Sequence, residues 1–378
     1  MQQHPRASRD NNFNLLRLVA ALLVLVTHSY GVTGFGDREP MLKIFGTSLG
    51  TFAVEVFFVT SGYLIAKSWD RRRAPGEFLW ARFLRIYPAL WVCVLFCVFV
   101  VGLYFTSLPA GEFLTHLSTW KFLLEDTTLM ILGVYTTLPG VFAVNGNAEG
   151  SVNVPLWTLP YEIKMYLGLL ALGWTGLLYK RLIPPLITIV AYGVYLWTVW
   201  ANYHEHGLDI YARFIFFFGF GTTLYLERDR IPLRWSIALV LIGLIAVSVA
   251  LPERDLRGIV LDLCTPYLVI FLALVPAGFF RSYNKVGDYS YGLYIYGFPV
   301  QQSLMALTGD RGMSVLANLL GTVLVAGLLA VVSWHCLEKH ALALKWRPWP
   351  LKSKAGVAHG NADQAGAFAR ADSPADRT

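Results

Sequence analysis

The sequence predicts an all-α, polytopic membrane protein of about ten transmembrane helices with both termini in the cytoplasm. The composition is 56% hydrophobic and 15% charged, with a mean hydropathy of +0.52, which is typical of a membrane protein and not of a soluble domain. Apolar runs of membrane length follow one another along most of the chain. Basic residues gather on alternate connections between these runs, so the net charge of +7 indicates contact with membrane lipids and no nucleic-acid partner.

The expected spans follow the apolar runs in chain order. A span needs about 20 residues to cross the hydrocarbon core. With a cytoplasmic N-terminus, 22 of the 31 Lys and Arg residues lie on inside connections and 6 on outside ones, which favours this orientation. The spans are placed at 14–34, 49–68, 86–106, 157–178, 183–203, 210–226, 233–251, 259–280, 288–308 and 313–336.

Three regions are expected along the chain. Residues 1–12 form a cytoplasmic N-terminal segment, 13–340 a membrane domain, and 341–378 a cytoplasmic tail whose small, polar, aperiodic composition predicts disorder. Within the membrane domain, residues 107–156 form a long external segment. Its apolar stretch 127–142 is too short for a span, and it is expected to be either a re-entrant or an interfacial cap.

Two polar residues lie inside the first apolar run, Arg17 and His28. Eleven residues at about 100° each bring both side chains to one face of a helix, and a rise of about 1.5 Å per residue separates them by roughly 16 Å. Because ionisable residues are costly in lipid, they usually face an interior pathway or a site. The pair is therefore the first candidate for function.

Arginines gather at the predicted cytoplasmic face. Arg17 lies near the inner end of the first span, and Arg82 and Arg85 lie where the third span starts. Guanidinium groups bind phosphate through two parallel hydrogen bonds, so these arginines are candidates for binding a phosphorylated ligand. The alternative is that they are positive-inside anchors for lipid headgroups.

A histidine and two carboxylates are expected to converge in the outer half of the membrane. His28 lies past the middle of the first span, and Glu55 and Glu162 lie at similar depth in spans that enter from outside. A carboxylate beside an imidazole fixes its tautomer and raises its basicity, as a general base requires. The alternative is a structural polar cluster that holds helices together.

A metal site is not predicted. His28, Glu55 and Glu162 are types of residue that bind zinc, and His204 and His206 form an HxH sequence. The sequence contains no HxxxH or HExxH pair at helical spacing, and the two loop histidines are expected to be solvated.

With these residues in view, the chain resembles the acyltransferase 3 family of integral membrane acyltransferases over most of residues 10–340. Arg17 and His28 match the family's motif of Arg or Lys, ten residues, then His. Other segments similar to family motifs follow in the expected order: VEVFFVTSGYLI from Val54, RFLRIYP from Arg82, WTLPYEIKMY from Trp157, VGDYSYGLYIYGFPV from Val286, and Glu338. The chain departs from the pattern at Glu55, where many members have Asp, and at Gly297, where many have His.

The resemblance implies transfer of an acyl group, commonly acetyl, from a cytoplasmic coenzyme A thioester to a hydroxyl of a carbohydrate or lipid-linked cell-envelope acceptor. Acetyl-CoA or another acyl-CoA is then a co-substrate, and the location is a bacterial cytoplasmic membrane. On this hypothesis Arg17, Arg82 and Arg85 bind coenzyme A, and His28 is the general base, supported by Glu162 and Glu55. Transient acylation of His28 is an open alternative.

Two other classes of protein fit part of the pattern. A secondary transporter or exporter of a small polar molecule would also have many spans with intramembrane charges, but the sequence contains no clear inverted repeat. A structural or sensory membrane protein would use the charges only to hold helices together, and it would tolerate a change of His28 to Gln.

Overall fold

The structure is a computed structural model that describes residues 10–129, 134–142, 150–201, 203, 207–309 and 312–346. Helices form the regular structure of these ranges, in which the β-bridges are two isolated pairs, Thr106–Val141 and Thr137–Ser151. The all-α prediction is confirmed. Most of the predicted N-terminal segment and of the predicted tail lies outside the described residues, and so do the loop histidines His204 and His206.

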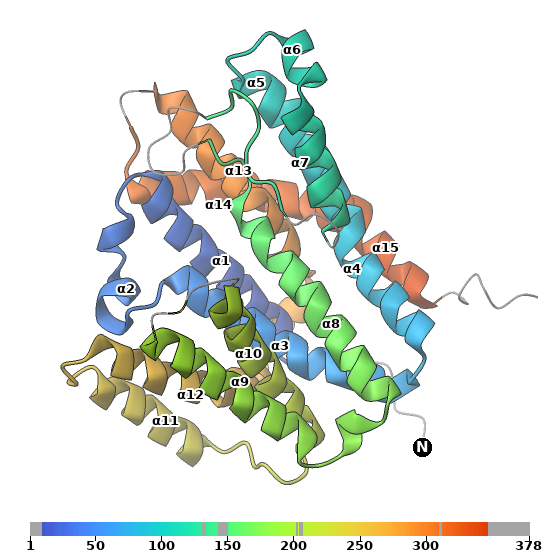
Figure 1. The fold of residues 1–378 in the computed structure, drawn as a ribbon, viewed down its shortest axis with the longest axis vertical. Coiled ribbons are helices and arrows are strands. Elements are labelled where there is room, and N and C mark those ends of the chain that lie inside the picture. The colour runs from blue at the N-terminus through green and yellow to red at the C-terminus, as the bar shows by residue number, and fades with distance from the viewer. Residues whose placement is uncertain are drawn as a thin grey trace, which may run out of the picture.

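The described helices are labelled in Figure 1. In chain order they are α1 (Phe13–Val32), α2 (Pro40–Phe45), α3 (Leu49–Arg72), α4 (Pro75–Phe96), α5 (Leu103–Phe105), α6 (Ala110–Thr115), α7 (Leu117–Thr128), α8 (Leu159–Trp174), α9 (Ile183–Trp200), α10 (Leu208–Leu226), α11 (Trp235–Ser248), α12 (Arg254–Leu274), α13 (Ser290–Thr308), α14 (Val315–Ser333) and α15 (Lys339–Ala343).

The helices coincide with the spans expected from the sequence, and the chain is a polytopic helical membrane protein. By length and composition, 6 of the described helical stretches are able to cross a membrane: α1, α3, α4 to α5, α9, α12, and α14 to α15. Helices α8, α10, α11 and α13 occupy the remaining expected positions and are shorter or less apolar. The total of ten spans and the cytoplasmic position of both termini stay predictions.

Prolines explain where two helix boundaries differ from the expected ones. The third span was expected from residue 86, but α4 begins at Pro75, since proline suits the first turn, where its missing N–H is no loss. Arg82 and Arg85 are therefore inside a helix. The eighth span is expected to reach residue 280, but α12 ends at Leu274, because Pro276 has no N–H to continue the helical hydrogen bonds.

Helices α1 and α3 run through the middle of the bundle, with α9 to α12 on one side and α13, α14 and α4 on the other (Figure 1). Glycines let α3 and α10 approach backbone to backbone. A Cβ atom added at Gly62 would overlap the carbonyl oxygen of Phe218, and one added at Gly221 would overlap that of Val59. This close crossing places the polar residues of α3 directly beside those of α10.

The segment expected outside the membrane turns back along α4. Helix α7 packs against α4, with Trp91 Nε1 donating to the carbonyl of Thr127 at 3.1 Å and Tyr87 Oη donating to that of Thr128 at 3.3 Å. Tyr87 is twelve residues into the helical stretch 75–105, so α7 reaches to the middle of that stretch. Part of the apolar stretch 127–142, residues 130–133, lies outside the described residues.

Candidate active site

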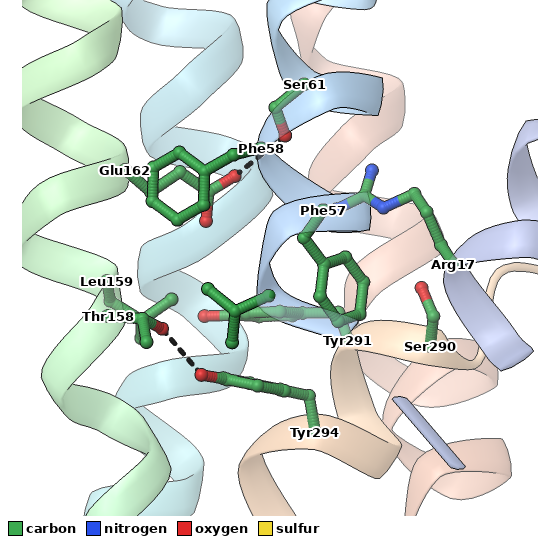
Figure 2. A pocket seen from close by; sticks show the side chains of 11 residues that line it. Arg17, Phe57, Phe58, Ser61, Thr158, Leu159, Glu162, Ser290, Tyr291 and Tyr294 are labelled. Carbon is green, nitrogen blue, oxygen red and sulfur yellow. Dashed lines mark hydrogen bonds between the residues drawn. The ribbon is translucent and has the colours of Figure 1, made fainter. Parts of the chain in front are cut away.

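Arg17 lines a narrow cavity between α1, α3, α8 and α13, which we call the Arg17 cavity (Figure 2). Its volume is about 30 Å³, comparable to the space of one water molecule. The Arg17 guanidinium lies over the Phe57 ring, with its Cζ 5.8 Å from the ring centroid. The cavity is lined by Arg17, Val54, Phe57, Phe58, Ser61, Thr158, Leu159, Glu162, Ser290, Tyr291 and Tyr294.

Glu162 faces the Arg17 cavity. It accepts a hydrogen bond from Ser61 Oγ at 3.4 Å and another from the Tyr166 hydroxyl, one turn further along α8. Arg82 lies on the other side of Tyr166, with its Cζ 5.8 Å from the centroid of that ring, and its Nη2 donates to Ser68 Oγ at 3.4 Å. The arrangement brings Arg17, Arg82 and Glu162 to one end of the site.

Arg17 and Arg82 keep unused hydrogen-bonding capacity. Their Nε atoms are buried without a hydrogen-bond partner among the described residues, and neither guanidinium has an ion pair with a described carboxylate. Buried donors normally have partners, so an unpaired pair of arginine donors beside a cavity fits an anionic ligand. Arg17 and Arg82 are therefore candidates for binding an anionic ligand.

Arg85, by contrast, is already paired. Its Nη2 donates to Asp288 at 2.6 Å, and its Nη1 lies 4.0 Å from Glu338. Asp288 also accepts from Ser290 Oγ at 2.6 Å. Two carboxylates thus face the Arg85 guanidinium, and its predicted binding of phosphate stays a prediction. Sequence reasoning missed Asp288, although an acid at the start of a predicted span, on the same predicted side of the membrane as several arginines, is a signal for an ion pair.

Glu55 is likewise paired away from His28. Its carboxylate is fully buried and lies 2.5 Å from Arg213 Nη2, which is also 3.2 Å from Asp262. Arg213 Nη1 donates to the Tyr195 hydroxyl at 2.8 Å. Helices α3, α9, α10 and α12 meet at this cluster. Arg213 and Asp262 received no role from the sequence, although an intramembrane arginine at the depth of two acids predicts pairing.

His28 lines a second and larger cavity, the His28 cavity, with a volume of about 370 Å³. Its imidazole is half-buried and stands edge-on to Phe298, with ring centroids 5.0 Å apart, and it makes no hydrogen bond to another described residue. The expected contacts of His28 with Glu55 and Glu162 are therefore absent from the described residues. Polar and aromatic side chains share the cavity wall: Thr27, Ser48, Thr51, Trp157, Thr158, Tyr195, Asp209, Arg213, Phe214 and Tyr294.

The two cavities adjoin. Three residues line both of them, namely Val54, Thr158 and Tyr294. Arg17 and His28, roughly 16 Å apart along α1, thus face two neighbouring cavities. An arginine in one cavity and a histidine in the next suit an extended ligand that is anionic at one end and reactive at the other.

Gly297 explains how closely α13 approaches α1. A Cβ atom at this position would overlap Leu25, a buried residue one turn from His28 on α1. A larger residue at position 297 would require the Leu25 side chain to move. Among the described residues, no group of three or more His, Cys, Asp and Glu side chains is arranged to hold a metal ion.

A helical membrane bundle whose adjoining internal cavities hold an arginine and a histidine is typical of a membrane protein that acts on an internal ligand. Comparison with known proteins indicates the type of reaction. The model of a family described as "Acyltransferase domain" matches residues 10–338. The chain belongs to this family, the acyltransferase 3 family, and it is an enzyme that transfers acyl groups other than aminoacyl groups.

Several known proteins are similar to the chain. The "O-acetyl transferase" of Shigella phage Sf6 is 29% identical over 357 residues, which are 88% of this chain and 96% of the relative. "Nodulation protein 10" of Rhizobium leguminosarum bv. viciae is 26% identical over 366 residues, 89% and 94% of the two chains. "Acyltransferase MdmB" of Streptomyces mycarofaciens is 33% identical over 167 residues, 43% and 39% of the two chains. No solved structure matches the chain significantly.

Proposed function

We propose that this enzyme moves an acetyl group from cytoplasmic acetyl-CoA to a hydroxyl of a carbohydrate or lipid-linked cell-envelope acceptor, in a bacterial cytoplasmic membrane. The family and a relative named "O-acetyl transferase" support the type of reaction. The proposed route is a passage through the two adjoining cavities, and it is supported by Arg17 in the wall of one cavity and His28 in the wall of the other. The basic inside connections favour the arginine end as the cytoplasmic one.

The donor enters at the arginine end in this proposal. Arg17 and Arg82 bind phosphate oxygens of coenzyme A, whose extended arm then lies along the passage toward the His28 cavity. The Arg17 cavity is narrow in the unliganded protein, with a volume of about 30 Å³, so binding has to move side chains apart. Positioning of the thioester would account for a large part of the rate enhancement.

His28 is the general base. Its imidazole faces a cavity large enough for part of an acceptor and makes no hydrogen bond to another described residue. It takes the proton of the acceptor hydroxyl as the oxygen attacks the thioester carbonyl, and returns a proton to the leaving thiolate. Trp157 and Tyr195, with Asp209, give the cavity the mixture of aromatic and polar surface that a sugar requires.

The carboxylates and Arg85 act through other residues in this proposal. Glu162 positions Tyr166 and, through it, Arg82. Glu55 holds Arg213 in the wall of the His28 cavity. Arg85 joins α4 to the start of α13 through Asp288. Each of these groups holds helices or lining residues of the passage in position, and none contacts the reacting atoms.

The proposal is tested with purified protein in lipid vesicles, supplied with acetyl-CoA labelled in the acetyl group and with surface polysaccharide or lipid fractions. We expect the label to appear in one fraction and mass spectrometry to show an added acetyl group there. Cells that lack the gene should lose that group. Consumption of no acetyl-CoA, together with flux of a small polar solute, would contradict the proposal and indicate a transporter.

A further inference from the structure

The wall shared by the two cavities contains a pair of hydroxyl groups. Of the three residues that line both cavities, Val54 is apolar, and Thr158 and Tyr294 each bear a hydroxyl. A donor that enters from the Arg17 cavity and an acceptor in the His28 cavity can meet where these cavities join. In the proposed reaction, Thr158 and Tyr294 therefore line the place where the acyl group leaves the donor and bonds to the acceptor.

The two hydroxyl groups are held in contact by packing and hydrogen bonds. Thr158 Oγ1 and Tyr294 Oη lie 2.5 Å apart (Figure 2), and both side chains are buried. The Pro155 carbonyl oxygen accepts from Tyr294 Oη at 2.6 Å and from Thr158 Oγ1 at 3.3 Å. The Tyr294 ring is fixed edge-on to Phe57, with centroids 5.7 Å apart.

The pair has one hydrogen that a ligand can use. Two hydroxyl groups have two hydrogens, of which one suffices to link the oxygens. The second points to the Pro155 carbonyl in the unliganded protein and can turn by rotation about the C–O bond. A donor hydroxyl that itself accepts a hydrogen bond is a stronger donor, because linked hydrogen bonds polarise one another.

We infer that Thr158 and Tyr294 form the oxyanion-stabilising element of the enzyme and donate a hydrogen bond to the carbonyl oxygen of the bound thioester. This inference rests on the proposed function, since it needs an acyl thioester in the passage. The other polar groups of the two cavity walls line one cavity only, so this pair is the hydrogen-bond donor common to the donor and acceptor sides.

The acceptor hydroxyl oxygen forms a bond to the thioester carbonyl carbon while His28 takes its proton, and the π electron pair moves to the carbonyl oxygen. That oxygen, now negative, receives the hydrogen bond of the Thr158–Tyr294 pair. When the carbonyl re-forms, the C–S bond breaks, and the coenzyme A thiolate leaves and takes the proton from His28. The products are an ester and coenzyme A.

Removal of both hydroxyls gives the main test. The double variant Thr158→Val, Tyr294→Phe keeps the shapes of both side chains and is expected to lower kcat by about 10²- to 10³-fold, the loss typical of an oxyanion donor. The KM for acetyl-CoA should stay unchanged, because the hydrogen bond strengthens in the transition state. Slow hydrolysis of acetyl-CoA by water without acceptor should fall by the same factor, since it passes through the same oxyanion.

Single variants show whether a loss of rate in the double variant comes from a folding defect. Each of Thr158→Val and Tyr294→Phe should lose about tenfold in kcat, since one hydroxyl remains to donate. Thr158→Ser keeps the hydroxyl and should restore most of the rate. Tyr296→Phe is the matched control on α13, because Tyr296 is buried and lines neither cavity. It should have the kcat of the unmodified enzyme.

The outcomes separate the inference from the function on which it rests. If the unmodified enzyme transfers acetyl groups and the double variant keeps the kcat of Tyr296→Phe, the hydroxyl pair has no part in catalysis and the inference is wrong. A raised KM with unchanged kcat would also overturn it, because the pair would then only bind the donor. No transfer by the unmodified enzyme would instead overturn the proposed function.

Discussion

Replacement of His28 by alanine is expected to lower kcat for acetyl transfer by about 10²- to 10⁴-fold, the usual contribution of a general base. The KM for acetyl-CoA should change little, because His28 lines the His28 cavity and not the Arg17 cavity, where the donor phosphates bind in our proposal. His28→Gln should be equally impaired, since an amide is polar but does not take up a proton near neutral pH. Initial rates with labelled acetyl-CoA measure both constants.

A histidine outside the cavities provides the control for this variant. His335 is exposed, and its Nε2 lies 3.2 Å from the Tyr289 hydroxyl. His335→Ala should therefore have the kcat of the unmodified enzyme at the same amount of folded protein. Near-normal kcat in His28→Ala would remove His28 from the mechanism. If His28→Gln has normal kcat and only His28→Ala loses activity, His28 has a purely structural role.

Replacement of Arg17 or Arg82 by glutamine should raise the KM for acetyl-CoA by about 10- to 100-fold, because a hydrogen bond to a charged group contributes about 1.5–3 kcal/mol. Neither guanidinium forms an ion pair with a described carboxylate, so its loss breaks no buried ion pair. Folding should therefore be retained. Steady-state kinetics against acetyl-CoA concentration, with size-exclusion profiles in detergent, separate the two effects.

Variants of two other arginines serve as comparisons for the Arg17 and Arg82 variants. Arg71 is exposed on the last turn of α3, and Arg71→Gln should leave the KM unchanged. Arg85→Gln removes the partner of the buried Asp288 and should reduce the amount of folded protein, since breaking a buried pair costs about 3–5 kcal/mol. If Arg85→Gln folds normally and raises the KM as much as Arg17→Gln, Arg85 binds the donor and the ion-pair interpretation is wrong.

The features that depend on a single helix were predicted well from the sequence. Arg17 and His28 belong to a single helix, whose fixed pitch sets both their separation and their common face. The structure places them in two adjoining cavities. Apolar length likewise located the helices, with errors where Pro75 and Pro276 set the boundaries. These features need no knowledge of how helices are rotated against one another.

Contacts between helices were predicted poorly, for a physical reason. Glu55 and Glu162 lie at the depth of His28 from their positions in the sequence, but depth does not fix the direction in which a side chain points. The close crossing of α3 and α10, which depends on Gly62 and Gly221, directs Glu55 to Arg213. A neighbour one turn along its own helix, Tyr166, engages Glu162.

In the proposed mechanism, one passage connects acyl-CoA on the cytoplasmic side with an acceptor on the other side. Reconstituted vesicles test it directly when acetyl-CoA is enclosed inside and the acceptor is supplied only outside. We expect labelled acetyl groups on the external acceptor, and no such transfer in His28→Ala vesicles. Labelling only when acetyl-CoA and acceptor share a compartment would contradict a connected passage, and with it the roles assigned to its two ends.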